Sequence, residues 1–300
     1  MNSSKTNLSI VHINIRGLRS NGHLLHQYLE TLNFPDIVTI NESKLNSSVD
    51  AMLPNYFCAS RKDSIHGHHG SLIFVKNGLS DIQEICSLKD LFNEEVIGIR
   101  IPGKQNRPTV NIITYYNPPG NYVNPTIFQH CRFLRGATVL TGDLNCKSSS
   151  WGSTFDDRQG DHLLHVLNDS SFVILNDGNM TRCDPIHGTE QALDIVVCNE
   201  KALSYFNCFN VGPNIGSDHY PISAEFHHLC QQTITHTRLL KNTDWNLFKE
   251  SLRDLPILNP STPEEVERDV SFITSAIKDA FHKACPVTKK IHKNVASLRK

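Results

Sequence analysis

Up to residue 226, short runs rich in valine and isoleucine follow one another along the chain, and polar residues mark their ends. Runs of this length and composition are typical of buried β-strands. Spacing typical of amphipathic helices occurs in fewer places. The segments that we expect to be strands are 9–15, 36–40, 71–75, 95–101, 110–116, 138–142, 192–197 and 222–226. The segments that we expect to be helices in this part of the chain are 23–32, 125–134 and 161–167.

Many short strands with helices at intervals predict an α+β fold in which two sheets pack together and helices cover them. The polar residues follow some strands, as Asn14 and Asp143 do, and precede others, as Asp194 does. These residues can lie together at one end of the sheets only if the sheets contain strands that run in both directions. This argues against a purely parallel sheet. We therefore predict an α+β protein with a four-layer α/β/β/α sandwich.

The pattern changes after about Leu229. Residues 231–238 are polar and rich in threonine, and helical spacing follows them. The segment 262–265 reads Thr-Pro-Glu-Glu, which is an N-cap, a proline at the first helical position and a capping-box glutamate. We expect one domain at residues 7–228 and a helical extension at 229–300. The last residues, 289–300, are basic, which is typical of a solvated chain end or, alternatively, of a linker that contacts phosphate.

Two polar motifs offer groups for acid–base chemistry. In the first, Asp143 and Asn145 follow Gly142 and lie two residues apart, so they share one side of an extended chain. In the second, His219 follows Ser217 and Asp218, which places an imidazole beside a carboxylate. An aspartate can accept a proton from water, and a histidine can donate a proton or contact a phosphate. Each motif taken alone also occurs as a plain turn or a capping turn.

Three further polar residues lie at strand ends. Glu42 offers hard oxygen ligands of the kind that Mg²⁺ prefers, and Asn14 ends the first run. Tyr116 precedes Asn117-Pro118-Pro119, whose prolines stiffen the turn. An exposed glutamate and a packed aromatic ring are the ordinary alternatives. Carboxylates, amides and a histidine gathered at one rim are the groups that a divalent metal and a phosphoester require.

Composition bounds the partners and the compartment. The net charge of −1 indicates no global basic surface, so any contact with a polyanion is expected to be local, metal-assisted or helped by another segment. The nine cysteines include no CxxC pair, which favours reduced thiols in an intracellular protein. No signal peptide or membrane-length apolar stretch is visible, so we expect the nucleus and the cytoplasm and no membrane partner.

In this order and spacing, the motifs resemble the endonuclease/exonuclease/phosphatase superfamily over residues of about 7 to 228. Finer features are similar to the apurinic-type endonuclease domain of non-LTR retrotransposons, with the jockey-like branch nearest. They are Trp151-Gly152-Ser153, Arg158 with Gly160, Thr181 upstream of Asp194, the Ser-Asp-His-x-Pro-Ile form at 217–222, and Thr243-Asp244-Trp245-Asn246-Leu247-Phe248. The resemblance implies a deoxyribonuclease-I-like sandwich, with 229–300 as a helical linker toward a reverse transcriptase domain that this sequence does not contain.

The resemblance also implies roles. Mg²⁺, with Mn²⁺ as an alternative ion, would be held by the metal-site residues Glu42, Asn14 and Asp218. The catalytic residues would be Asp143, Asn145, His219, Asp194 and Tyr116. Asp143 would position or deprotonate the attacking water, and Asn145 would orient Asp143 and contact the phosphate. Asp194 would hold His219 against the phosphoryl oxygens, and Tyr116 would lie near the leaving oxygen. Substrate contacts would come from Thr181, Ser217 and Arg16.

The function that follows from this resemblance is a metal-dependent endonuclease that nicks target DNA, so that the freed 3′-hydroxyl primes reverse transcription. Its partners would be DNA and, in the parent polyprotein, a reverse transcriptase domain and element RNA. Two alternatives stay open at this point. One is another phosphoesterase on the same scaffold, a repair nuclease or an inositol-phosphate phosphatase. The other is a catalytically dead remnant that only binds nucleic acid.

Overall fold

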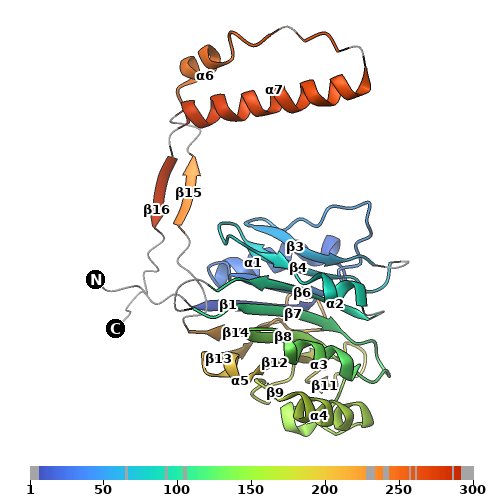
Figure 1. Ribbon diagram of the computed structural model, residues 1–300. Coiled ribbons are helices and arrows are strands. Elements are labelled where there is room, and N and C mark those ends of the chain that lie inside the picture. The colour runs from blue at the N-terminus through green and yellow to red at the C-terminus, as the bar shows by residue number, and fades with distance from the viewer. Residues whose placement is uncertain are drawn as a thin grey trace, which may run out of the picture. The chain divides into compact units, whose positions relative to one another are not determined.

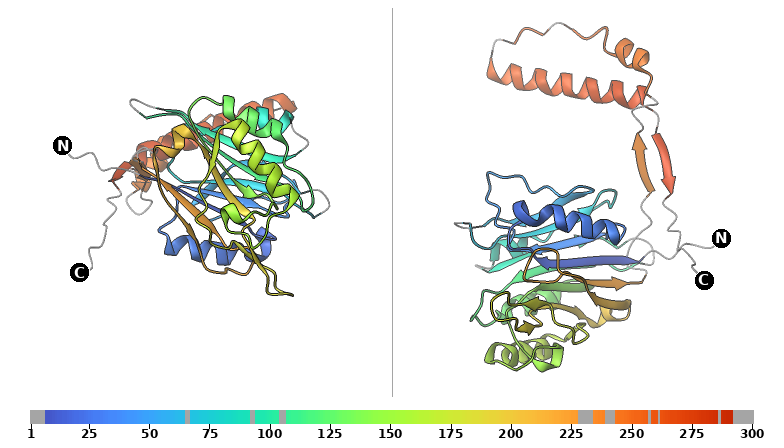
Figure 2. Two further views of the ribbon diagram at one scale, coloured as in Figure 1. Left: turned by 90° about the horizontal axis from the view of Figure 1, so that it is seen from below. Right: turned by 180° about the vertical axis from the view of Figure 1, so that it is seen from behind.

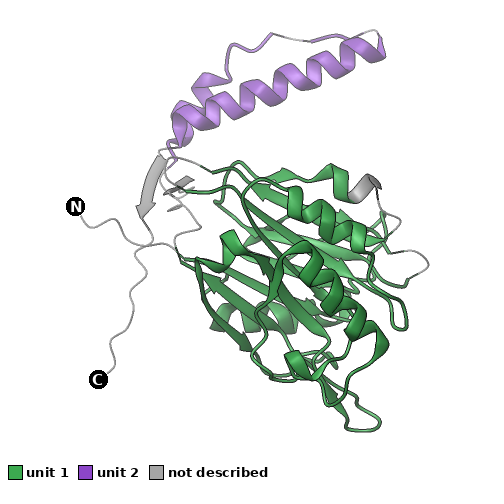
Figure 3. Ribbon diagram, turned by 60° about the horizontal axis from the view of Figure 1, so that its bottom comes forward, with its two compact units in different colours: residues 1–232 green, residues 233–300 purple. Residues whose placement is uncertain are grey.

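The computed structural model describes residues 7–64, 67–91, 94–103, 107–227, 234–238, 243–256, 258–260, 262–285 and 287–291. The chain divides into two compact units, residues 1–232 and 233–300 (Figures 1 and 3). Each unit is described by itself below. Residues 292–300, which hold most of the basic end of the chain, lie outside the described residues.

The first sheet has six strands in the order β13-β14-β1-β2-β4-β3. Within it, β1 and β2 are parallel and every other neighbouring pair is antiparallel. Because Asn14 pairs in register with Asn41, the carboxyl ends of β1 and β2 lie side by side. The strands are β1 (Leu8–Asn14), β2 (Ile37–Asn41), β3 (Tyr56–Lys62), β4 (Ser71–Lys76), β13 (Phe206–Val211) and β14 (Ile222–Phe226).

The second sheet also has six strands, in the order β5-β6-β7-β8-β12-β9. Here β7 and β8 are parallel, and β12 runs antiparallel to β8 with Asp194 directly opposite Asp143. A short hairpin of β10 (Arg182–Cys183) and β11 (Glu190–Gln191) lies outside both sheets. The strands of the second sheet are β5 (Gln83–Glu84), β6 (Glu95–Ile101), β7 (Val110–Tyr116), β8 (Ala137–Asp143), β9 (Phe172–Ile174) and β12 (Asp194–Asn199).

Helices cover the outer faces of both sheets (Figures 1 and 2). The helix α1 (Leu18–Thr31) buries Leu25 and Leu29 against outward residues of β1, β2 and β4. On the second sheet, α3 (Pro125–Phe133) and α4 (Arg158–Ser170) pack against β7, β8 and β12. The shorter helices are α2 (Cys86–Leu91), α5 (Glu200–Leu203) and the 3₁₀ turn Ser149–Trp151. The predicted four-layer α/β/β/α sandwich is confirmed.

All eight expected strands are present, with ends shifted by two residues or fewer. The expected helices are present too, although α1 begins at Leu18 rather than His23. The sequence pattern missed the short edge strands β5 and β9 of the second sheet. In the first sheet it missed β3 and β13, which form the two edges. In each of these strands several side chains are partly or fully exposed, and the pairing register shifts once. Polar residues and a bulge remove the apolar signal on which strand prediction depends.

The layer between the two sheets changes character along the strands. At one end, which we call the apolar end, the inward residues belong to one hydrophobic cluster that includes Leu8, Ile10, Ile37, Val110, Ile112, Ala137 and Val139. At the other end, which we call the polar end, the buried residues are His12, Asn14, Thr39, Asn41, Thr114, Thr141, Asp143 and Asp194. Because inward positions recur every second residue, each central strand contributes to both ends.

The second unit contains two helices and a two-stranded ribbon. The helices are α6 (Trp245–Ser251) and α7 (Pro263–Ala284), and they confirm the expected helical extension. The capping box is formed, since the hydroxyl of Thr262 accepts from the amide of Glu265 and the Glu265 carboxylate accepts from the amide of Thr262, both at 3.2 Å. The strands β15 (Ile234–Arg238) and β16 (Val287–Ile291) pair with each other, and neither was expected. Their pairing joins segments far apart in sequence, so local spacing does not reveal it. Within the described residues, no helix combines the length and the apolar character needed to span a lipid bilayer.

Candidate active site

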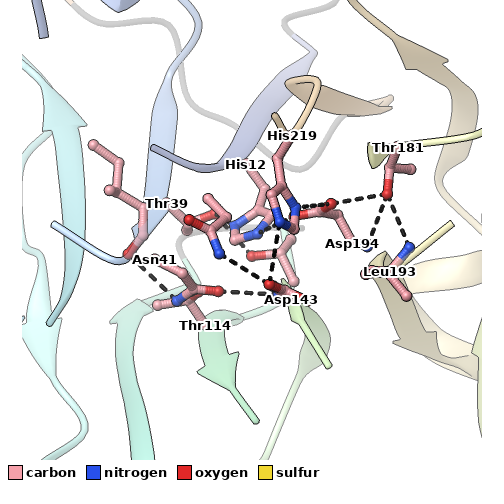
Figure 4. A network of polar contacts seen from close by, with 12 residues as sticks. His12, Thr39, Asn41, Thr114, Asp143, Thr181, Leu193, Asp194 and His219 are labelled. Carbon is pink, nitrogen blue, oxygen red and sulfur yellow. Dashed lines mark hydrogen bonds and ion pairs between the residues drawn. The ribbon is translucent and has the colours of Figure 1, made fainter. Parts of the chain in front are cut away.

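Side chains from both sheets meet at the polar end of the inter-sheet layer (Figure 4). The hydroxyls of Thr39 on β2 and Thr141 on β8 lie 2.8 Å apart and join the two sheets. Close by, the amide of Asn41 on β2 donates to the hydroxyl of Thr114 on β7 at 3.2 Å. Buried polar groups require such partners, because an unpaired group loses its hydrogen bonds to water without replacement. The two sheets are therefore joined here by hydrogen bonds rather than by apolar packing.

Asp143 is the acceptor at the centre of this network. Its Oδ2 accepts from Nδ2 of Asn14 at 2.9 Å, and its Oδ1 accepts from the backbone amide of Asn145 at 3.1 Å. Its own amide donates to Oδ1 of Asn41 at 3.0 Å. Asn145 is fixed in turn, because its side chain donates to the backbone oxygen of Asn117. The carboxylate thus has one orientation, set by neighbours from β1, β2 and its own loop.

Gly142 allows β8 to approach β7 closely just before Asp143. A Cβ atom at this position would lie 1.8 Å from the backbone oxygen of Tyr115. Any side chain would therefore push the strands apart. The Gly-Asp motif is thus explained by packing as well as by the turn that the sequence suggests.

His219 and Asp194 form a buried pair beside Asp143. The His219 Nδ1 atom donates to Oδ2 of Asp194 at 2.7 Å, and its Nε2 lies 3.7 Å from Oδ2 of Asp143. The hydroxyl of Thr181 also donates to Oδ2 of Asp194, at 2.8 Å. The same hydroxyl accepts from the amides of Leu193 and Asp194. A histidine held in this way presents its second nitrogen toward Asp143 in a fixed orientation.

Burial and charge act on these three groups in different directions. Burial raises the pKa of Asp143, and the nearby imidazole of His219 opposes that rise only in part. Burial would also raise the pKa of Asp194, but His219 and His12 outweigh it and hold that pKa below its usual range. For His219, burial disfavours the charged ring, yet Asp194 and Asp143 raise its pKa to about 9. His219 is therefore cationic and Asp194 anionic near neutral pH, while Asp143 is a stronger base than an exposed aspartate.

Glu42 lies at the edge of the same network. Its Oε1 accepts from Nδ2 of Asn14 at 3.2 Å and from the hydroxyl of Tyr116 at 3.0 Å. Burial and the nearby Glu42 carboxylate raise the pKa of Tyr116, so its phenol remains a donor. Lys44 approaches the other Glu42 oxygen at 3.8 Å. The amide of Asn14 therefore bridges the two carboxylates of Glu42 and Asp143.

The loop at 217–219 is held by two different sets of contacts. Ser217 donates to the backbone oxygen of Asn14 at 2.7 Å and accepts from the amide of His219 at 3.2 Å. Asp218 is clasped by two guanidinium groups, with Arg16 at 3.1 Å from Oδ1 and Arg182 at 2.9 Å from Oδ2. The Asp218 side chain is only 4% exposed, whereas that of Arg16 is 49% exposed. The loop is thus attached both to β1 and to the β10–β11 hairpin.

Several residues around the site have left-handed backbone conformations. A positive φ is costly for residues with a side chain, and such residues cluster at functional sites. Five residues in or next to the network have it, with φ between 49° and 64°: Arg16, Glu42, Lys44, His69 and Asn145. His69 joins this group because its ring lies 5.2 Å from that of Tyr116. The surrounding hydrogen bonds hold the chain in these conformations and so fix where the side chains point.

The structure brings most of the expected site residues together, but it gives several of them supporting contacts. Asn14, Glu42, Tyr116 and Asp143 are directly connected, and His219 and Asp194 adjoin them. Thr181 and Ser217, expected to touch substrate, are almost fully buried and bond to Asp194 and to the backbone. Asp218, expected at the metal, has arginine at both oxygens. Burial and these bonds favour a supporting role for all three.

Sequence reasoning did not assign several residues of the network to the site, among them His12, Asn41 and Arg182. His12 lies inside a Val/Ile-rich run, where a polar residue is easily taken for a solvent-facing position, and Asn41 ends the next run beside Glu42 without being assigned a role. The signal that could have found His12 is its separation of two from Asn14, since alternate residues of a strand share a face. Arg182 carries no comparable signal, because its partner Asp218 is distant in sequence.

The donor set bears on whether a divalent cation fits here. Within the part of the chain that the structure describes, no group of three or more His, Cys, Asp or Glu residues is arranged to hold a metal. Mg²⁺, however, commonly keeps several waters and binds through one or two carboxylates together with substrate phosphate. Glu42, with Asn14 beside it, offers one such carboxylate at the edge of the network. The residues fit an ion held mainly by water and substrate, and they do not fit a closed protein cage.

The comparisons with known proteins agree with this architecture. Residues 110–223 match the model of a family described as endonuclease-reverse transcriptase. The search of curated proteins found no match. The fold resembles that of the endonuclease domain of TRAS1, a telomere-specific non-LTR retrotransposon, with a TM-score of 0.61 and 18% identity over 75% of this chain and 100% of that one.

Two further solved structures share the fold. An apurinic endonuclease from Leishmania major has a TM-score of 0.62 and 15% identity, over 74% of this chain and 88% of its own. A 3′-5′ exonuclease from Neisseria meningitidis has a TM-score of 0.58 and 17% identity, over 73% and 99%. At these identities the structures establish the fold, and the family model adds the sequence likeness. The first unit thus has the fold of these nucleases, and residues 110–223 are similar in sequence to the endonuclease-reverse transcriptase family.

Proposed function

We propose that the domain is a metal-dependent endonuclease that nicks DNA. The observation that carries this proposal is the position of Asp143, held by the amide of Asn14 on one side and facing the charged His219 on the other. A base of raised pKa beside a cationic donor is the arrangement that attack of water on a phosphodiester requires. The TRAS1 domain with the same fold is itself described as an endonuclease, which supports the choice of DNA as substrate.

In the proposed mechanism, Asp143 accepts one proton of the attacking water, because burial makes it more basic than an exposed carboxylate. The water oxygen bonds to phosphorus as the P–O3′ bond breaks, and the departing 3′ oxygen takes up a proton from solvent water. His219 donates hydrogen bonds to the phosphoryl oxygens through Nε2, while Asp194 keeps the ring charged and oriented. The phenol of Tyr116, which donates to Glu42 in this structure, would lie near the leaving oxygen of the substrate. Phosphoryl transfer needs positioning and charge neutralisation more than covalent help, and these groups provide both.

Glu42 with Asn14 would hold the divalent cation, which by ligand preference is Mg²⁺, with Mn²⁺ able to replace it. When bound, the cation would neutralise charge on the scissile phosphate. Arg16 has the exposure needed to meet a neighbouring phosphate, even though its guanidinium also contacts Asp218. Thr181 and Ser217 would keep Asp194 and the loop in place without touching DNA.

The retrotransposon role is the finer part of the proposal. A nick by this domain would free a 3′-hydroxyl from which a reverse transcriptase domain of the parent polyprotein copies element RNA. The family description, which joins an endonuclease to a reverse transcriptase, supports this reading. The unit at 233–300 would then be the linker between the two activities.

A nicking assay on supercoiled plasmid tests the proposed activity. We expect relaxed circles with Mg²⁺, none with EDTA, and none for Asp143→Ala or His219→Ala. Asn111→Ala is the matched control, because Asn111 is buried on β7 but bonds to Thr138 and to the backbone of residue 135, away from the network. Plasmid binding without nicking would contradict the proposal and favour the nucleic-acid-binding remnant. Phosphate release from a soluble inositol phosphate, without nicking, would favour a phosphatase instead.

A further inference from the structure

His12 lies on β1, and the proposed mechanism gives it no contact with water or phosphate. Its side chain is 0% exposed and points between the sheets at the polar end. Its Nδ1 lies 3.0 Å from the hydroxyl of Thr39, which in turn lies 2.8 Å from the hydroxyl of Thr141. A buried imidazole surrounded by polar atoms from both sheets is not explained by apolar packing.

The second ring nitrogen of His12 faces the catalytic pair. His12 Nε2 lies 3.5 Å from Oδ1 of Asp194 (Figure 4). Both atoms are buried, and neither has a hydrogen-bond partner elsewhere among the described residues. The other oxygen of Asp194 is occupied, since it accepts from His219 and from Thr181. His12 is thus placed to supply the donor that Oδ1 of Asp194 otherwise lacks.

We propose that His12 is a positioning residue that donates from Nε2 to Oδ1 of Asp194 and so fixes the plane of that carboxylate. This proposal rests on the proposed function, in which Asp194 orients His219. The proposal requires the tautomer with its proton on Nε2, in which Nδ1 accepts from the hydroxyl of Thr39 at 3.0 Å. The contact at 3.5 Å shortens to a hydrogen bond with a small movement of either side chain.

The consequence for catalysis is transmitted through Asp194. With both oxygens engaged, the carboxylate cannot rotate, and His219 keeps its Nε2 aimed toward Asp143. Without His12, Oδ1 of Asp194 would be a buried charge with no donor, and the carboxylate would turn to find another one. His219 would follow it away from the phosphate site. His12 acts through Asp194 and touches neither water nor phosphate.

The test compares His12→Gln with His12→Leu in the full chain. Glutamine places an amide donor close to where Nε2 lies in histidine, whereas leucine has similar volume and no donor. We expect His12→Leu to lower kcat for plasmid nicking roughly 10- to 100-fold, as losses of supporting hydrogen bonds typically do, with KM nearly unchanged. We expect His12→Gln to recover most of that loss. Asn111→Leu, which removes a buried polar side chain elsewhere in the second sheet, should leave kcat unchanged.

A second measurement keeps the test independent of activity. The His219 Nδ1 proton, in a 2.7 Å bond to Asp194, should give a far-downfield proton resonance in the folded protein. We expect this resonance to persist in His12→Gln and to broaden or move upfield in His12→Leu. If the wild-type chain nicks nothing, the proposed function fails, and this resonance alone decides the role of His12. Equal kcat for wild type and His12→Leu, or equal losses in the Leu and Gln variants, would overturn the proposal.

Discussion

The two ends of the inter-sheet layer are built from the same central strands, and the inward residues at both ends are buried. At one end these residues are apolar, and at the other they are polar or charged. At the apolar end, residues such as Ile112 and Val139 fill the space between the sheets. At the polar end, the same strands β7 and β8 carry Thr114, Thr141 and Asp143 instead. Burying apolar surface stabilises a fold by about 25 cal/mol per Å², whereas burying charge costs free energy unless it is paired.

The difference indicates that the two ends of each central strand serve different purposes. The apolar end contributes stability, and the polar end holds groups whose pKa values are shifted by burial and by one another. Such shifts are what catalysis at neutral pH requires, and they are obtained at the expense of stability. Substitutions at the apolar end should therefore lower stability with little effect on activity. Substitutions at the polar end should lower activity with little loss of stability.

The largest expected effect is the loss of activity on Asp143→Asn. Removing the base should lower nicking roughly 10²- to 10⁴-fold, the range that general base catalysis contributes. The amide bears no buried negative charge, so the free energy of unfolding at pH 8 should be unchanged or higher. Plasmid nicking and urea unfolding on the same preparation measure both quantities. A clear loss of stability in this variant would contradict the division between the two ends.

The opposite signature is expected for Ile112→Ala at the apolar end. The side chain is fully buried, and its loss leaves a cavity, so the free energy of unfolding should fall by about 2–5 kcal/mol. Nicking per folded molecule should remain within about twofold of wild type, because Ile112 belongs to the apolar cluster and carries none of the polar groups of the network. Urea unfolding and active-site-normalised kinetics at 15 °C measure the two effects. A large fall in specific activity would mean that the two ends are coupled.

The pH dependence of stability sharpens the comparison, because His219 has its pKa raised from 6.5 to about 9 on folding. The folded protein keeps a proton that the unfolded chain releases above pH 6.5. The stabilisation is therefore complete below pH 6.5 and is lost as the pH rises to about 9, a change on the order of 3 kcal/mol. His219→Asn should lack most of this loss between pH 6 and 9.5. Equal pH slopes for the variant and the wild type would show that His219 is not charged in the folded protein.

A smaller effect, on Mn²⁺ binding, distinguishes Glu42 from Asp218, the two acidic residues that the sequence analysis placed at the metal site. We expect Glu42→Gln to weaken Mn²⁺ binding roughly 10-fold or more, because it removes the carboxylate that we propose as the ligand of the ion. Asp218→Asn should change the Mn²⁺ affinity by less than about twofold, since the charge of Asp218 is neutralised by Arg16 and Arg182. Titration followed by electron paramagnetic resonance reads binding without activity. Equal losses in the two variants would return Asp218 to the metal site.

Much of the fold follows from the sequence, because the central strands are long apolar runs and the sandwich needs strands of both directions. The polar residues at the ends of these strands also lie close together, as the sequence predicts. Asp143 and Asp194, for example, lie directly opposite each other. The sequence could not show that Asp218 is occupied by arginine, since that contact joins three distant segments. The separation of two between His12 and Asn14 indicates that they share a face of the strand, but it does not reveal the contact of His12 with Asp194. A local sequence pattern contains no information about contacts between distant segments. This holds for side-chain contacts and for the pairing of β15 with β16.

The facing register of β8 and β12 makes the site intolerant of length changes. Asp194 lies opposite Asp143, and neighbouring residues of each strand point to opposite faces. Deleting one residue within Asp194–Asn199 would turn the following side chains over, or it would move the carboxylate to the helix-covered face. The geometry of the proposed site therefore depends on the number of residues in each strand as well as on the identity of the acidic residues.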